Sequence, residues 1–147
     1  MNKFTRYFLL IALALLTLTV HAEQKKRFAN YDVHYSVVNS TFITPKVAAA
    51  YNITRGNNRA FVNISVREIS ADGSNKEKRA VVTGKSSDLI RSASLDFNEI
   101  IEKDAIYYFA ELKFNDKDLR RFDIQIQPDP NVAPYTLTFS QKIYVDL

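Results

Sequence analysis

The sequence contains no cysteine, only two histidines and only three glycines. Without cysteine the folded chain must be held by packing and sheet hydrogen bonds alone, although small exported domains often rely on disulfides. The glycines are too far apart to form a phosphate-binding loop, and no G-x-S-x-G serine-hydrolase motif is present. Because a single histidine, His34, follows the N-terminal apolar run, a zinc site is disfavoured. The sequence therefore predicts neither a metal site nor a cofactor.

Long apolar runs are also absent, except at the N-terminus. Lys3 and Arg6 precede an uncharged, largely apolar run of about 14 residues, and Val20 and Ala22 occupy the small-residue positions of a cleavage site. This order predicts a cleaved secretory signal over residues 1–22. The alternative, an uncleaved membrane anchor, is disfavoured because the run is too short to span a bilayer comfortably. We therefore expect export to the periplasm.

Residues 23–147 have the length of a single domain with a core of its own. The formal net charge of +4 falls by two once Lys3 and Arg6 leave with the signal. The remaining surplus is small and is not clustered in one run. A nucleic-acid partner is therefore not expected, and neither is a membrane span in the mature chain.

Most of the mature chain alternates apolar and polar residues, which is the period of half-buried β-strands. Clear alternation occurs in four stretches, which are residues 32–37, 62–67, 121–126 and 135–143. Shorter strands are expected at 80–83 and 89–97. Residues 105–114 are apolar on both faces, so this strand is either central and covered on both sides or carries a bulge. About seven strands at this spacing predict an all-β, immunoglobulin-like antiparallel sandwich.

Turn and helix signals separate these strands. Turns are expected at 70–75, where Gly73 supplies a positive φ, and at 115–118 and 128–134. Residues 44–51 break the β pattern, because Thr44 can cap a helix that begins with Pro45 and continues in good helix formers. We therefore expect one short helix between the first two strands.

Several short motifs have a fixed spacing that is more specific than a general strand pattern. They are Val33-His34-Tyr35, Ser40 with Phe42, Pro45-Lys46-Val47-Ala48, Tyr51 with Ile53, Arg55, Arg59-Ala60, Val62-Asn63-Ile64-Ser65 and the ending Gln141-Lys142-Ile143-Tyr144. Together they resemble the DUF4426 family of small gammaproteobacterial periplasmic proteins, a domain of unknown function. The resemblance implies a periplasmic β-sandwich and supplies no activity, because none is assigned to the family.

One candidate surface follows from the strand phase. His34 and Asn63 both point away from the predicted core, and they share a surface if their strands belong to one sheet. The connecting segment brings Arg55 and Arg59 to the start of the second strand, and arginine suits carboxylates and phosphates. We therefore predict that these four residues border a surface that recognises an anionic group. The alternative is that the arginines pair with neighbouring carboxylates and that Asn63 bonds the loop.

Three functions are compatible with these observations. The leading hypothesis is a non-enzymatic periplasmic module that binds a protein or a small anionic ligand. The second is a hydrolase-like enzyme that uses His34 as a general base. The third is an assembly or chaperone-like protein that pairs through an exposed sheet edge. A pocket that holds His34 with a hydroxyl or carboxylate would favour the enzyme, and a long uncharged edge strand would favour pairing.

Overall fold

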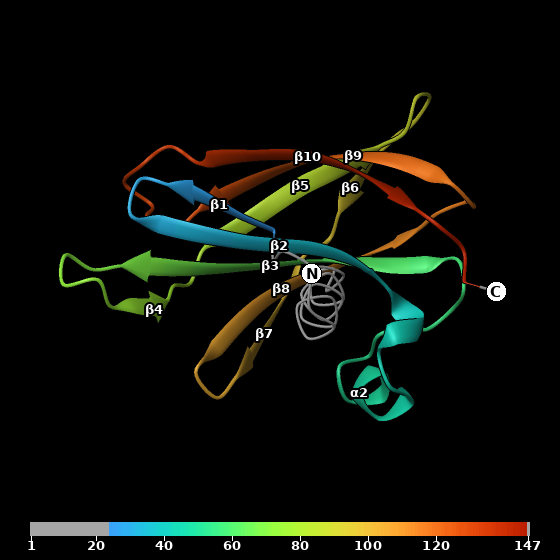
Figure 1. The fold of residues 1–147 in the computed structure, drawn as a ribbon, viewed down its shortest axis with the longest axis horizontal. Helices are drawn as coiled ribbons and strands as arrows, with labels where there is room; N and C mark the ends of the chain where they lie inside the picture. Colours follow the sequence, from blue (N-terminus) through green and yellow to red (C-terminus); the bar gives the residue numbers. More distant parts are fainter. Residues whose placement is uncertain (1–23, 147) are drawn as a thin grey trace, which may run out of the picture.

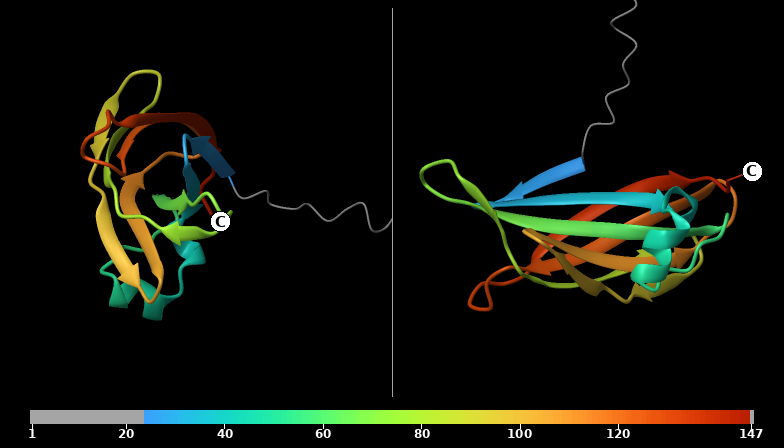
Figure 2. Two further views of the ribbon diagram at one scale, coloured as in Figure 1. Left: turned by 90° about the vertical axis from the view of Figure 1, so that its left-hand side faces the viewer. Right: turned by 90° about the horizontal axis from the view of Figure 1, so that it is seen from below.

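The computed structural model describes residues 24–146, so the predicted signal lies outside the described residues. Two antiparallel sheets pack face to face (Figures 1 and 2). The six-stranded sheet, called the first sheet here, contains β1 (Gln24–Phe28), β2 (Tyr31–Asn39), β3 (Arg59–Ile69), β4 (Asn75–Glu77), β7 (Asn98–Glu102) and β8 (Ala105–Lys113). The four-stranded second sheet contains β5 (Val81–Ser87), β6 (Ser92–Leu95), β9 (Asp118–Gln127) and β10 (Tyr135–Ile143). The predicted all-β sandwich is confirmed.

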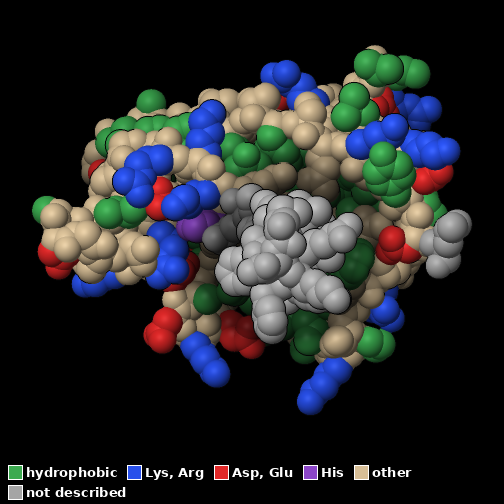
Figure 3. Space-filling view, viewed as in Figure 1, with side chains coloured by type: hydrophobic (Ala, Val, Ile, Leu, Met, Phe, Trp, Pro, Cys, Tyr) green, Lys and Arg blue, Asp and Glu red, His purple; other side chains and the backbone are tan. Residues whose placement is uncertain are grey.

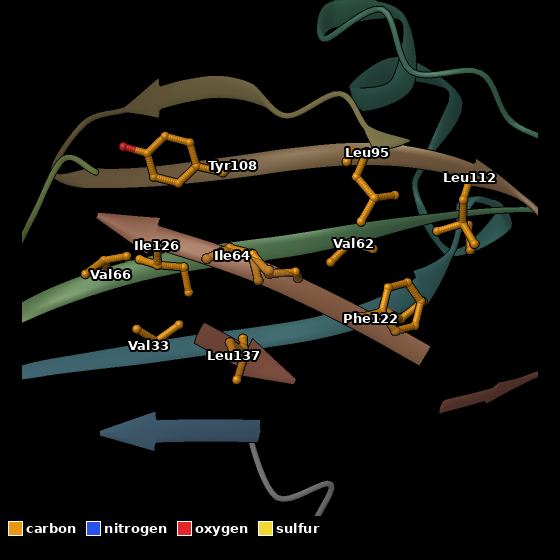
Figure 4. Packing of buried hydrophobic residues seen from close by; sticks show 14 of the residues in the cluster. Val33, Val62, Ile64, Val66, Leu95, Tyr108, Leu112, Phe122, Ile126 and Leu137 are labelled. Atoms are coloured by element: carbon orange, nitrogen blue, oxygen red, sulfur yellow. The ribbon is translucent and has the colours of Figure 1, made fainter. Parts of the chain in front are cut away.

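The core lies between the two sheets and is built from the predicted inward faces. Val62, Ile64 and Val66 of β3 are fully buried, as are Phe122, Ile124 and Ile126 of β9. Figure 4 shows Phe122 and Ile126 of β9 lying with the three β3 side chains in one cluster between the two sheets. The period-two pattern therefore placed the core-facing residues of both strands correctly.

Strand β8 resolves the alternatives left open for residues 105–114. It pairs with β3 on one side and with β7 on the other, and both registers run without interruption, so no bulge is needed. Tyr108, Ala110 and Leu112 face the core, while Tyr107 and Phe109 are half-buried on the outer face. The strand is central, and its apolar outer face is partly covered.

The connection between β2 and β3, residues 40–58, contains a 3-10 turn (Ser40–Phe42) and the helix α2 (Pro45–Ala50). As predicted, the Thr44 side chain caps the helix by accepting a hydrogen bond of 3.3 Å from the Val47 amide. The predicted turns are also present, and Gly73 adopts a φ of +83°. Among residues 24–146, no helix combines the length and apolar character needed to cross a membrane.

Three short strands, β1, β4 and β7, were not predicted. Strand β1 has consecutive charged residues from Lys25 to Arg27, and β4 has only three residues, so neither shows a clear period. The strand expected at 89–97 was wrong at its start, since the structure begins β6 at Ser92. The Asp88 side chain accepts hydrogen bonds from the amides of Ile90 and Arg91, and these bonds hold a turn instead.

Candidate functional site

The outer face of the first sheet carries a continuous depression over β2, β3 and β8. Side chains alternate between the two faces along a strand, so His34, Ser36 and Val38 of β2 lie on this outer face. The same face carries Phe61, Asn63 and Ser65 of β3 and Tyr107 and Phe109 of β8. The connecting segment 40–58 lies against one end of the face. The fold thus places β2 and β3 beside β8, although β8 lies far from both in the sequence.

One part of the depression, the polar hollow, has a volume of about 400 Å³. Its lining includes His34, Ser36, Asn63, Ser65 and Tyr107. The sheet register sets these positions, because His34 lies opposite Ser65 and Ser36 lies opposite Asn63. The hollow therefore presents hydroxyl, amide and imidazole groups from two neighbouring strands.

The other part, the apolar groove, has a volume of about 350 Å³ and lies between the sheet and the connecting segment. Val38, Phe61, Tyr107 and Phe109 contribute from the sheet, and the rings of Phe61 and Phe109 lie 5.3 Å apart in an edge-on arrangement. The apolar lining from the connecting segment consists of Ile43, Val47, Tyr51 and Ile53. The groove thus has a mainly aromatic floor, formed by the sheet, and a mainly aliphatic lip, formed by the connecting segment.

A hydrogen bond ties the connecting segment to the far side of the groove. The Tyr51 hydroxyl bonds to Glu102 at the end of β7, and this bond together with desolvation raises the pKa of Tyr51. Both residues line the groove. The bridge holds the lip in position over β7 and β8.

The polar hollow and the apolar groove meet at Asn63. Ser36, Val38, Asn63 and Tyr107 line both. The Asn63 side-chain oxygen Oδ1 is buried and has no hydrogen-bond partner among the described residues. A buried acceptor without a donor costs about 1–3 kcal/mol. Its position therefore suits a donor group supplied from the depression.

The four predicted site residues are divided by the structure into two groups. His34 and Asn63 line one hollow, but Arg55 and Arg59 line neither part of the depression. The Arg59 guanidinium lies 3.7 Å from the Glu111 carboxylate, and Arg55 donates to the Thr41 carbonyl at 3.2 Å. Arg59 shares the outer face of β3 with Asn63, and Phe61 lies between them. The recognition role of the arginines stays a prediction.

The aromatic floor was missed by the site prediction, although the sequence contained a signal for it. Residues 60–62 and 105–109 are apolar on both faces, which a strand with a solvent-exposed face would not need. Phe61, Tyr107 and Phe109 are the outer-face members of those runs. Doubly apolar runs in an otherwise alternating chain therefore indicated a covered outer face.

An ion-pair cluster of Asp32 with Lys25 and Arg27 lies beside the polar hollow. The buried Asp32 carboxylate lies two residues before His34 on the same face of β2, and it accepts hydrogen bonds from the Arg27 guanidinium at 2.7 and 3.0 Å. Arg27 first, and then Lys25, hold the pKa of Asp32 down at about 2, against the opposing effect of burial. Asp32 is therefore ionised at neutral pH, and both of its carboxylate oxygens already accept hydrogen bonds from Arg27 and Lys25.

Comparison with known proteins identifies the family. Residues 25–146 match the family described as "Domain of unknown function (DUF4426)". The chain belongs to the DUF4426 family. A crystal structure of a family member from Pseudomonas aeruginosa PAO1 has 30% sequence identity and a TM-score of 0.75, covering 87% of this chain and 99% of that chain. No curated protein matches the chain.

Two more distant structures share the fold. FetP from uropathogenic Escherichia coli strain F11, expressed recombinantly in the periplasm of E. coli BL21(DE3), has 10% identity and a TM-score of 0.59, covering 86% of this chain and 96% of that chain. A copper-bound variant of FetP has 12% identity and a TM-score of 0.56, covering 86% of this chain and 97% of that chain. At these identities the likeness concerns the fold alone.

The side chains of the described part of the chain do not include a cluster of the kind that holds copper. Within residues 24–146, no group of three or more His, Cys, Asp or Glu side chains is arranged to hold a metal ion. His34 is the one histidine in that range, and the chain has no cysteine. Imidazole and thiolate are the ligands that copper prefers. The likeness to FetP therefore concerns the fold and assigns no metal to this chain.

Proposed function

We propose that this DUF4426 protein is a non-enzymatic periplasmic binding module for a small amphipathic molecule. The observation that carries the proposal is the buried Oδ1 of Asn63, which has no hydrogen-bond partner within residues 24–146 and lies at the junction of an apolar groove and a polar hollow. A ligand with an apolar body and one hydrogen-bond donor satisfies both parts at once. Ligand sites are commonly mostly apolar pockets with a few placed polar groups.

The apolar groove accounts for affinity in this proposal. Burial of apolar surface contributes about 25 cal/mol per Å², so an aromatic or aliphatic body gains free energy against Phe61 and Phe109. Aromatic rings add a preference for edge-on contacts with a planar ligand.

The polar hollow accounts for orientation. Asn63 Oδ1 accepts the donor of the ligand, and Ser36, Ser65 and His34 lie in the same hollow to contact further polar groups. A ligand that lacks the donor leaves Oδ1 buried and unpaired, so the site discriminates against it. If the ligand carries an anionic group, the proposal places that group at the end of the groove nearest Arg59.

A periplasmic location is supported by three observations. Residues 1–22 have the order of a secretory signal. The described residues contain no helix that could cross a membrane. FetP, which shares the fold, was expressed in the periplasm.

The hydrolase alternative has weaker support. Ser36 and Ser65 share the polar hollow with His34, so a hydroxyl lies in the same pocket as the imidazole. However, no aspartate or glutamate is among the described residues that line this hollow. The adjoining apolar groove offers a body-sized surface for a ligand, so the hollow and groove together support binding more directly than acyl transfer.

The strand-pairing alternative depends on β10, the edge of the second sheet. Its nine residues contain a single charge, Lys142, which is the kind of edge that pairs readily. However, Gln141 donates to the Val37 carbonyl of β2 at 3.1 Å, and Tyr135 stacks on Phe28. Strand β10 already contacts the first sheet at both ends, which leaves less of its edge for a partner.

A fluorescence titration tests the binding proposal. The probe is N-phenyl-1-naphthylamine, which has two apolar ring systems and a single N–H donor. We expect its emission to rise and shift to the blue with the mature protein, and Val47→Asp at the groove lip to weaken binding about tenfold. The control is Leu119→Asp, which changes an exposed aliphatic residue on β9. No probe binding, or an equal loss in both variants, would reject the groove as the site.

A further inference from the structure

The tip of the β5–β6 hairpin exposes two adjacent aliphatic side chains. Leu89 is 99% exposed and Ile90 is 90% exposed. The hairpin projects beyond the body of the sandwich (Figure 1, and the left view of Figure 2). Figure 3 shows hydrophobic side chains projecting at the upper right, beside lysine and arginine side chains. Isolated exposed aliphatics are ordinary, but a projecting pair of this kind needs a partner.

The loop is built to present these side chains rather than to fold them back. The Asp88 carboxylate oxygen Oδ1 accepts hydrogen bonds of 2.7 Å from the amides of both Ile90 and Arg91. The Asp88 amide donates to the Arg91 carbonyl at 3.0 Å and closes the turn. The two amide bonds lower the pKa of Asp88, so its carboxylate is ionised and holds this conformation at neutral pH.

Around the hairpin, the basic side chains are more exposed to solvent than the acidic side chains. Lys85 and Arg91 are exposed, and the Arg121 side chain is 59% exposed at the base of the hairpin, opposite Ser87. The neighbouring acids are less exposed, with Asp88 at 28%, Asp123 at 23% and Asp118 at 10% exposure. Asp123 pairs with Arg121 and Asp88 lies 3.9 Å from Arg120, which leaves Lys85 and Arg91 as the exposed bases nearest the tip. An approaching surface therefore meets two aliphatic side chains first and basic side chains next.

We propose that this hairpin tip docks onto an anionic lipid surface, with Leu89 and Ile90 inserted among the acyl chains and Arg91 at the headgroups. A single apolar anchor binds membranes only marginally, and stable docking takes a second, electrostatic signal. The basic side chains beside the tip supply that signal for acidic headgroups. The site is separate from the groove on the first sheet, so this proposal does not depend on the proposed function.

The shape of the tip favours a bilayer over a protein pocket. A protein partner would need a concavity matched to two protruding side chains, and such anchors are usually Trp, Tyr or Arg, with leucine under-represented. A bilayer accepts a protruding aliphatic tip without a preformed pocket. The charge order, apolar first and basic behind, also matches the depth profile of a membrane interface.

Vesicle co-sedimentation of the mature protein tests the proposal. The vesicles are phosphatidylcholine alone and an equimolar mixture of phosphatidylcholine and phosphatidylglycerol. We expect binding to the anionic vesicles that weakens at high salt. The double variant Leu89→Ser/Ile90→Ser should lose about tenfold or more of this binding, and Arg91→Gln should lose the preference for phosphatidylglycerol.

Val132→Ser is the matched control, because Val132 is an exposed aliphatic residue in the β9–β10 loop at the opposite end of the second sheet. It should sediment like the wild type, and all variants should melt at the wild-type temperature. The proposal is overturned if the wild type binds neither vesicle, or if the double variant binds as well as the wild type. Absence of binding to either vesicle would instead favour a protein pocket as the partner of the tip.

Discussion

His34 and Asn63 line the same hollow although neither lies opposite the other in the sheet, since His34 pairs with Ser65 and Asn63 pairs with Ser36. The two residues are diagonal neighbours on the outer face of β2 and β3. Side chains in diagonal positions of an antiparallel pair are about 7–8 Å apart, which leaves room for a group bound between them. Asn63, at one end of this diagonal, lies where the polar hollow meets the apolar groove, and His34, at the other end, lines the hollow alone.

Removal of Ile64 should be costly, because its side chain is fully buried between the sheets. We expect Ile64→Ala to lower the free energy of unfolding by about 2–5 kcal/mol. The control, Ser65→Ala, lies on the outer face of the same strand and should cost less than about 0.5 kcal/mol. Denaturant melts measure both, and equal effects would contradict the assigned strand faces.

Stability should fall in acid through Asp32. Hydrogen bonds from Arg27 lower the pKa of Asp32 from its ordinary 3.8 to about 2. The stabilisation is therefore fully present above pH 3.8 and is lost as the pH falls toward about 2. Thermal melts of the wild type and of Arg27→Ala should diverge above this window and converge below it.

Lys26→Ala is the control for that experiment, because it removes a charge from the same strand without contacting Asp32. It should melt with the pH profile of the wild type. A profile for Arg27→Ala that stays parallel to the wild type down to about pH 2 would show that the ion pair does not lower the pKa of Asp32.

Arg55 and Arg59 decide whether an anionic group is recognised. If they border the ligand, Arg55→Ala and Arg59→Ala should weaken binding of the anionic probe 1-anilinonaphthalene-8-sulfonate and leave the neutral N-phenyl-1-naphthylamine unaffected. Melting should change little, because an exposed pair such as Arg59–Glu111 contributes about 0–1 kcal/mol. Lower stability with both probes still bound would mean that the arginines only hold the connecting segment.

Export should produce a mature protein that begins at Glu23. The order of Lys3, Arg6, the apolar run and Ala22 predicts cleavage after Ala22. Intact mass of protein from the periplasmic fraction measures this directly. A membrane-associated chain that still carries residues 1–22 would contradict the prediction.

The fold could be predicted from local patterns, because alternation along β3 and β9 sets their buried faces whatever their neighbours are. The helix could be predicted for a similar reason, since Thr44 and Pro45 act within one turn. The apolar groove could not, because it depends on β8 pairing with β3, and the two strands lie far apart in the chain. Strand β1 was missed because its charged residues pair with Asp32 of β2, a contact that alternation does not reveal.

Asn63→Leu, measured for both stability and probe binding, tests the central claim most directly. The substitution removes the buried acceptor at the junction of the hollow and the groove, which no described residue satisfies. If Asn63 serves a ligand, the variant should be as stable as the wild type or up to about 1 kcal/mol more stable, and should bind N-phenyl-1-naphthylamine about tenfold more weakly. A variant that is less stable and binds the probe as well as the wild type would contradict the account.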